Sequence, residues 1–168
     1  MDAIETLLAI EAIKQLKARY FYTLDTKQWR DYGALFTADA VIDFSSQQAL
    51  MQQVGTLAAI SANEVWRYVG GAALAAWIEP LLGDVASVHH GHDPQITLTD
   101  ADRASGIWAM YDRLETPFEV FHGYGHYHET YRRVDGQWYF ASLTLTRLKG
   151  VWKRRDLIAG TAAALPRG

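Results

Sequence analysis

The chain has 168 residues, of which 49% are hydrophobic and 21% are charged, and its formal net charge is −3 at pH 7. This balance is typical of one globular domain with a full hydrophobic core, and it disfavours a nucleic-acid-binding protein, which needs a basic surface. Cysteine is absent, which excludes disulfides and thiolate chemistry. No run of about 18 apolar residues is present, so we expect a cytoplasmic protein that does not cross a membrane.

The N-terminal half is predicted to be mostly helical, because apolar side chains recur at spacings of three to five residues. The expected helices cover residues 3–25, 26–36 and 72–83. Thr26 is the expected N-cap of the second helix, and a short strand is expected over residues 40–44. Residues 46–68 have weak periodicity, and we interpret them as an insertion, partly helical, that covers one end of the fold.

The C-terminal half changes to strand-like runs separated by turn signals. The expected strands cover residues 85–99, 103–115, 118–134 and 137–152. The pair Asp135-Gly136 is typical of a tight hairpin turn. Helices followed by an antiparallel meander indicate an α+β domain, with a curved sheet wrapped over the helices. We expect residues 1–168 to form a single domain with a mobile C-terminal tail over about 152–168.

All six histidines fall in two windows, SVHHGHDPQITL and FHGYGHYHETY. They are His89, His90 and His92 in the first window and His122, His126 and His128 in the second. One interpretation of the first window is a metal site, since imidazole and the nearby Asp93 carboxylate are zinc ligand types. However, neighbouring side chains in a strand point to opposite faces, and no HExxH or comparable ligand motif is present. We therefore expect no bound metal.

Acid–base chemistry is the stronger interpretation of the first window, because a histidine can take up and return a proton near neutral pH. Such a histidine needs an orienting carboxylate, and Asp25 at the end of the first helix is a candidate. The residues alone leave open a second role for Asp25, in which it caps the following helix.

Four segments of the chain carry a distinctive pattern: IEAIKQLKARYFYTLDTKQW, HHGHDPQITL, YDRL and YRRVDGQWYF. Together they resemble the bile acid 7α-dehydratases, in the SnoaL-like branch of the nuclear transport factor 2-like superfamily. Scytalone dehydratase is a more distant relative by the same pattern, and the resemblance covers most of residues 9–148. It implies a cone-shaped α+β barrel, in which three N-terminal helices pack in a strongly curved mixed sheet with the pocket in its mouth.

The resemblance also implies which residues form the site. The catalytic residues would be Tyr20, Asp25 and His89, and the substrate-binding residues would be Trp108, Met110, Asp112 and Tyr127. His89 would carry the proton, with Asp25 as its partner. Trp108 and Met110 enter because strand alternation places them on the same face as Asp112. Two alternatives stay open: Tyr20 as a packed core residue, and Asp112 as the partner of an arginine at the sheet edge.

The chain also departs from these relatives. Leu114 lies about where scytalone dehydratase has a second catalytic histidine, and the pocket arginine of the lindane dehydrochlorinases falls near Leu143. Extra residues between AVIDF and VHHGH imply a different pocket cover. We therefore expect conserved chemistry with a different substrate. The second-window histidines are expected to point outward, toward a neighbouring subunit.

The function expected from this pattern is a cofactor-independent lyase, a dehydratase that removes water from a bulky ring-containing hydroxy-carbonyl compound, steroid-like or aromatic. No GxGxxG or GxxxxGK[ST] cofactor motif is present. The alternatives are carbon–carbon cleavage with loss of formaldehyde, isomerisation or cyclisation by the same dyad, and a non-catalytic module that binds a small ligand. The expected partners are an apolar ring-containing substrate and further copies of the chain, as a trimer in preference to a dimer.

Overall fold

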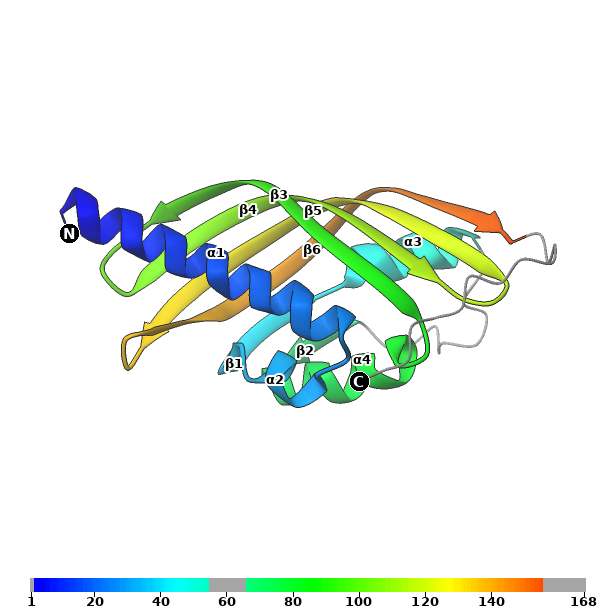
Figure 1. Ribbon diagram of the computed structural model, residues 1–168, viewed down its shortest axis with the longest axis horizontal. Coiled ribbons are helices and arrows are strands. Elements are labelled where there is room, and N and C mark those ends of the chain that lie inside the picture. Colours follow the sequence, from blue (N-terminus) through cyan, green and yellow to red (C-terminus); the bar gives the residue numbers. More distant parts are fainter. Residues whose placement is uncertain (1, 55–65, 156–168) are drawn as a thin grey trace.

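A curved six-stranded mixed sheet forms the body of the molecule, and a long helix runs along one of its faces (Figure 1). The structure is a computed structural model that describes residues 2–54 and 66–155. Its helices are α1 (Ala3–Asp25), α2 (Trp29–Gly33), α3 (Ser45–Val54) and α4 (Gly71–Leu82). Its strands are β1 (Phe36–Asp43), β2 (Arg67–Val69), β3 (Ala86–Leu98), β4 (Arg103–Glu115), β5 (Glu119–Val134) and β6 (Gln137–Arg154). This is the predicted α+β class.

The strands lie in the order β2-β1-β6-β5-β4-β3. Strands β3 to β6 form an antiparallel meander, whereas β1 pairs with β6 in parallel. Asp135 and Gly136 both have positive φ, 50° and 79°, as the tight β5–β6 hairpin requires. The antiparallel meander therefore matches the alternation seen in the sequence.

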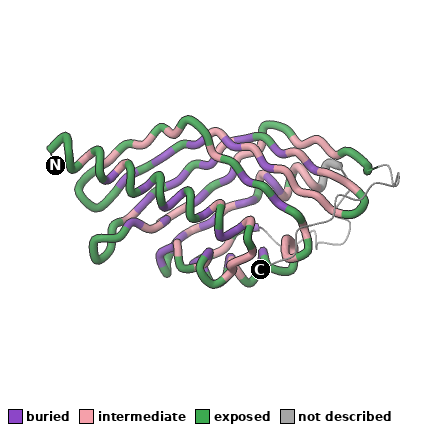
Figure 2. Tube along the Cα trace, in the orientation of Figure 1, coloured by how far each residue is buried: buried purple, intermediate pink, exposed green. Residues whose placement is uncertain are grey.

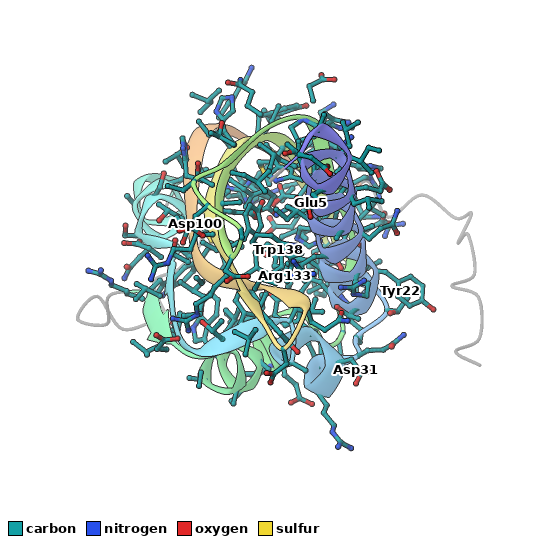
Figure 3. The ribbon with its side chains drawn as sticks, turned by 90° about the vertical axis from the view of Figure 1, so that its left-hand side faces the viewer. Glu5, Tyr22, Asp31, Asp100, Arg133 and Trp138 are labelled. Carbon is teal, nitrogen blue, oxygen red and sulfur yellow. The ribbon has the colours of Figure 1, made fainter. Side chains whose placement is uncertain are left out.

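Helix α1 covers the inner face of the sheet with one buried stripe. Its buried apolar residues are Ala9, Ile13, Leu16, Tyr20 and Leu24, spaced by three or four positions. Figure 2 shows that burial is concentrated where the helix and the central strands face each other. In the end-on view of Figure 3, Trp138 lies between helix and sheet, whereas Tyr22 points away from the core.

The chain between α1 and α2 differs from the prediction. Thr26 is the C-cap of α1 and not the N-cap of α2, which begins at Trp29 after Gln28. The Thr26 hydroxyl donates to the carbonyl oxygen of Tyr22 at 2.6 Å, so it closes the last turn of α1. Lys27 then adopts a left-handed backbone conformation that ends the helix.

The predicted insertion is helical in its first part, where α3 packs against β6, and it ends in the short strand β2. Residues 55–65 lie outside the described part, and so does the predicted mobile tail beyond residue 155. Strand β6 itself continues to Arg154, so the first residues assigned to that tail belong to the sheet. Within the described residues, no helix combines the length and the apolar character needed to cross a membrane.

Candidate active site

A cavity of about 260 Å³ lies between the inner face of the sheet and helices α1, α3 and α4. Its apolar lining includes Leu24, Phe44, Met51, Trp66, Trp77, Ile78, Leu114, Phe121, Leu145 and Trp152. Its polar lining includes Tyr20, Gln47, His89, Asp112, Tyr127 and Arg147. A concave site with apolar walls and a few grouped polar side chains is typical of small-molecule binding.

Aromatic rings form much of the apolar wall. The rings of Phe44 and Trp77 stack with centroids 5.7 Å apart, and Trp66 meets Trp77 edge-on at 5.1 Å. On the sheet side, the rings of Phe121 and Trp152 lie 4.4 Å apart. Such surfaces favour a flat or ring-containing ligand, because aromatic faces pack against other rings. Gln47, Met51 and Trp66, from the segment that we interpret as an insertion, also line the cavity.

Asp25 and His89 form a tightly bonded pair beside the cavity. The ring Nδ1 of His89 lies 2.6 Å from Oδ1 of Asp25, and the backbone N–H of His89 donates to Oδ2 at 2.8 Å. The Ser87 hydroxyl also donates to Oδ1, at 2.9 Å. An ionised carboxylate only accepts, so Nδ1 carries the proton and Nε2 is left to exchange one with a ligand. Asp25 thus partners His89 and does not cap α2.

Tyr20 lies in the second-last turn of α1, lines the cavity and is 1% exposed. Burial, with Tyr127 beside it, raises the pKa of Tyr20 well above its usual range. Burial and the charge of Asp112 raise the pKa of Tyr127 in the same direction. Both phenols therefore stay protonated at physiological pH and can act as neutral hydrogen-bond donors.

Asp112 lines the cavity and forms an ion pair with Arg147, which was one of the two interpretations left open for it; its role in substrate binding stays a prediction. Nη1 of Arg147 donates to Oδ1 of Asp112 at 3.0 Å, and Nη2 donates to Oδ2. Nε of Arg147 donates to the side-chain oxygen of Gln47. Both charged side chains are nearly fully buried, at 5% and 2% exposure. A bidentate pair of this kind fixes two polar groups on the wall without adding net charge.

Trp108 and Met110 share the inner face with Asp112, as strand alternation predicts, but they do not line the cavity. The indole N–H of Trp108 donates to the hydroxyl of Tyr131 at 2.9 Å in the core. Met110 contacts the site indirectly, because its sulfur accepts a hydrogen bond from Arg147 at 3.2 Å.

Arg147 was missed by the sequence reasoning, which placed the position of a pocket arginine near Leu143. Leu143 is buried, but it is not among the residues that line the cavity.

The other histidines lie on the outer face of the sheet. His90 and His92 are exposed on β3, on the face opposite to His89. The β5 histidines alternate with inward residues such as Tyr127, as predicted; they are His122, His126 and His128. In the part of the chain that the structure describes, no three His, Cys, Asp or Glu side chains are grouped so as to hold a metal ion.

Comparison with known proteins identifies a matching family and similar folds. A family model described as a SnoaL-like domain matches residues 5–144. A protein of Gibberella zeae named as a cyclase, FGR4, is 25% identical over 150 residues, covering 86% of this chain and 93% of that protein.

Two solved structures share the fold. One carries the name scytalone dehydratase, from Novosphingobium aromaticivorans; its TM-score is 0.72 at 20% identity, covering 95% of this chain and 99% of that chain. The other is a hexachlorocyclohexane dehydrochlorinase of type 2, with a TM-score of 0.69 at 18% identity, covering 98% and 100%.

Proposed function

The chain belongs to the SnoaL-like domain family, and from that premise we propose that it is a cofactor-independent lyase, a dehydratase acting on a ring-containing hydroxy-carbonyl compound. The single observation that carries the proposal is the Asp25–His89 pair, joined by a 2.6 Å hydrogen bond, whose histidine lines a cavity with aromatic side chains in its walls. The names of similar structures support an elimination, because a dehydratase and a dehydrochlorinase both remove a small molecule from a substrate.

The geometry supports a simple proton path. Nε2 of His89 removes a proton from the carbon next to the carbonyl group, and the C–H electrons form the new double bond as the C–O bond breaks. The departing hydroxide takes the proton back from the imidazolium and leaves as water. Asp25 stabilises that imidazolium and holds the ring in one tautomer. One histidine thus serves both steps, which suits elimination from a single face of the substrate.

Tyr20 supplies the complementary hydrogen bond in this mechanism. Its phenol is protonated and lines the cavity, so it can donate to the substrate carbonyl oxygen, where negative charge develops, or to the leaving hydroxyl. A well-placed donor to a developing oxyanion contributes about 3 kcal/mol to transition-state stabilisation. The Asp112–Arg147 pair, with Tyr127 nearby, would hold a polar group at another point of the substrate.

Ring-containing, uncharged substrates suit the cavity best. Aromatic and aliphatic side chains make up most of the lining, and the buried Asp112 and Arg147 charges neutralise each other. A charged ligand would lose its hydration on entry, and Glu119, which also lines the cavity, would repel an anion. An apolar ring system with a hydroxyl and a carbonyl group satisfies both features.

Cyclisation is a second candidate, favoured by the 25% identical protein named as a cyclase. It would begin with the same removal of a proton from carbon by His89, followed by formation of a bond within the substrate. The oligomeric state stays a prediction, and sedimentation of the purified chain would distinguish the expected trimer from a dimer or monomer.

Mass spectrometry tests the proposed reaction. The purified chain is incubated with a panel of steroidal and aromatic β-hydroxy carbonyl compounds, beside Asp25→Asn and His89→Ala. We expect at least one compound to lose one water, and both variants to abolish this loss. An isomer of unchanged mass would support cyclisation or isomerisation, and loss of formaldehyde would indicate carbon–carbon cleavage. Compounds that bind all three proteins equally well without turnover would contradict the enzyme proposal.

A further inference from the structure

Lys27 occupies a backbone position that usually belongs to glycine. The N–H of Gln28 donates to the carbonyl oxygen of Thr23 at 2.8 Å, and the N–H of Lys27 donates to that of Leu24 at 3.3 Å. This pair of bonds is the Schellman motif, whose residue just after the C-cap is left-handed and most often glycine. Lys27 fills it with φ 64°. A side chain there costs conformational energy that glycine avoids, so its presence calls for a compensating contact.

The Lys27 side chain makes such a contact with the dyad through one intervening hydroxyl. Its Nζ donates to Oγ of Ser87 at 2.7 Å. Ser87 in turn donates to Oδ1 of Asp25 at 2.9 Å, the same oxygen that binds the ring of His89. An ammonium group has no acceptor, so Ser87 must accept from Lys27. The single hydroxyl proton of Ser87 is thereby directed at Asp25.

We propose that Lys27 and Ser87 are positioning residues for the Asp25–His89 dyad, an inference that rests on the proposed function of that dyad. The chain of hydrogen bonds fixes the carboxylate oxygen that the imidazole uses. It also places a positive charge behind the carboxylate, which opposes protonation of the ring and favours the neutral base.

Lys27 affects the balance between the neutral and the protonated ring of His89 because of the charges that surround this ring. Asp25 contacts the ring from α1, and Asp112 faces it from β4, where the two residues are register partners. Asp112 is neutralised by Arg147 from β6. The negative charge of Asp25 is therefore the one that Lys27 offsets, through Ser87.

The test is an NMR pH titration of the His89 ring in the full-length protein without substrate. Lys27→Met keeps a side chain on the left-handed backbone and removes the charge. We expect it to raise the midpoint of the His89 titration by roughly 0.5–1 pH unit. Lys27→Arg should restore the original midpoint. Lys14→Met, which removes the same charge from an exposed position of α1, should leave it unchanged.

Two further variants separate positioning from a purely structural role. In Ser87→Ala the link is broken, so adding Lys27→Met should shift the midpoint by much less than it does in the native chain. Lys27→Gly should move the midpoint as Lys27→Met does, while its thermal unfolding midpoint stays equal or rises, because glycine suits the backbone. The inference is overturned if Lys27→Met does not change the midpoint of the His89 titration. It is also overturned if Lys27→Met shifts this midpoint by the same amount in the Ser87→Ala background as in the native chain.

The titration and the turnover experiment fail in different ways. The midpoint is measured without substrate, so a missing shift rejects the positioning role even when a compound is found to lose water. If the shifts occur and the wild-type chain turns over nothing while binding compounds, the lyase proposal fails and the polarised dyad remains. With a turned-over compound in hand, the acid limb of kcat/KM should move with the NMR midpoint in each variant.

Discussion

The carboxylate of Asp25 lies 2.6 Å from the ring of His89, although 64 positions separate the two residues in the chain. The contact exists because α1 ends at Asp25, beside the start of β3. The same carboxylate also accepts the backbone N–H of His89, at 2.8 Å. Ring and backbone are thus held by one group, which restricts both the rotation of the imidazole and its tautomer.

Asp25→Asn should lower kcat by about 10²–10⁴-fold on the compound that loses water. The amide keeps the shape of the carboxylate but cannot stabilise the imidazolium, and it can favour the wrong tautomer of His89. Binding of the compound should change little, because Asp25 is not among the residues that line the cavity. Stopped assays give kcat, and equilibrium titration of the compound gives its affinity.

The matched control is Asp31→Asn, which removes the same charge from an exposed position of α2. It should retain full activity. Wild-type activity in Asp25→Asn would remove the dyad from the mechanism, whatever the structure shows of its hydrogen bonds.

Tyr20→Phe should lower kcat by about 10²-fold while leaving the fold intact, since it deletes one donor and no packing volume. Burial raises the pKa of Tyr20 well above its usual range, so the phenol remains a donor throughout the accessible pH range. The rate of the wild type should therefore not fall between neutral pH and pH 10 through ionisation of Tyr20, and Tyr20→Phe should have the same basic side of the pH–rate profile. A fall in rate that disappears in Tyr20→Phe would mean that Tyr20 ionises during the reaction.

Local patterns were sufficient for most of the fold. The strands β3 to β6 follow from alternation, and the hairpin at Asp135 and Gly136 follows from residues that accept positive φ. Patterns could not tell where α1 leaves the sheet. Ile4, Leu7 and Leu8 belong to its apolar periodicity, yet each is 66% exposed or more, because the first turns of α1 have no sheet to cover (Figure 1).

Arg147 was beyond local reasoning because β6 contains an irregularity. Trp152 lines the cavity, and strict alternation from this residue along the strand would turn Leu148 inward. The apolar side chain of Leu148 favours the same assignment. The register shifts between Tyr124 and Gly125 of β5, so Arg147 faces the cavity and Leu148 is 73% exposed. Which residue is turned out by a bulge depends on the neighbouring strand, and a single sequence does not show it.

The start of α2 was misassigned for a similar reason, although the end of α1 at Asp25 was predicted correctly. Threonine is a favoured N-cap, so Thr26 was predicted to begin a helix. It ends one because Lys27 adopts a left-handed conformation, and the Lys27 side chain is held there by Ser87 from β3. The capping preference was correct as a local statement and was overridden by a contact across the fold.

Gly123 of β5 is predicted to be essential for seating the Asp112–Arg147 pair. A Cβ at this position would overlap Oδ1 of Asp112 and Nη1 of Arg147. Gly123→Ala should therefore lower the free energy of unfolding by about 1–3 kcal/mol and displace the pair. The loss of stability caused by Gly123→Ala should largely disappear in a protein that also carries Asp112→Ala and Arg147→Ala. Chemical denaturation gives the free energy of unfolding in the native and in the doubly substituted background. An equal loss in the two backgrounds would assign the cost to the strand backbone.

A second buried ion pair joins α1 to β5. Lys17 of α1 bonds to Glu129 of β5, and both side chains are essentially fully buried. The hydroxyl of Tyr131 donates to Glu129, and the Lys17 ammonium sits 3.5 Å from the centre of the Tyr127 ring. Burial lowers the pKa of Lys17 from 10.5 to about 8, against the attraction of Glu129.

This lowered pKa predicts that stability rises with pH. Between about pH 8 and 10.5 the unfolded chain holds the Lys17 proton and the folded chain has released it, so raising the pH favours the folded state. Across that window the free energy of unfolding of the wild type should rise by about 3 kcal/mol relative to Lys17→Met, at about 1.4 kcal/mol for each pH unit. Urea denaturation at several pH values measures it, and Lys14→Met, altered at an exposed position, should instead follow the wild type. Parallel curves for wild type and Lys17→Met would mean that the buried amine keeps its proton with ordinary affinity.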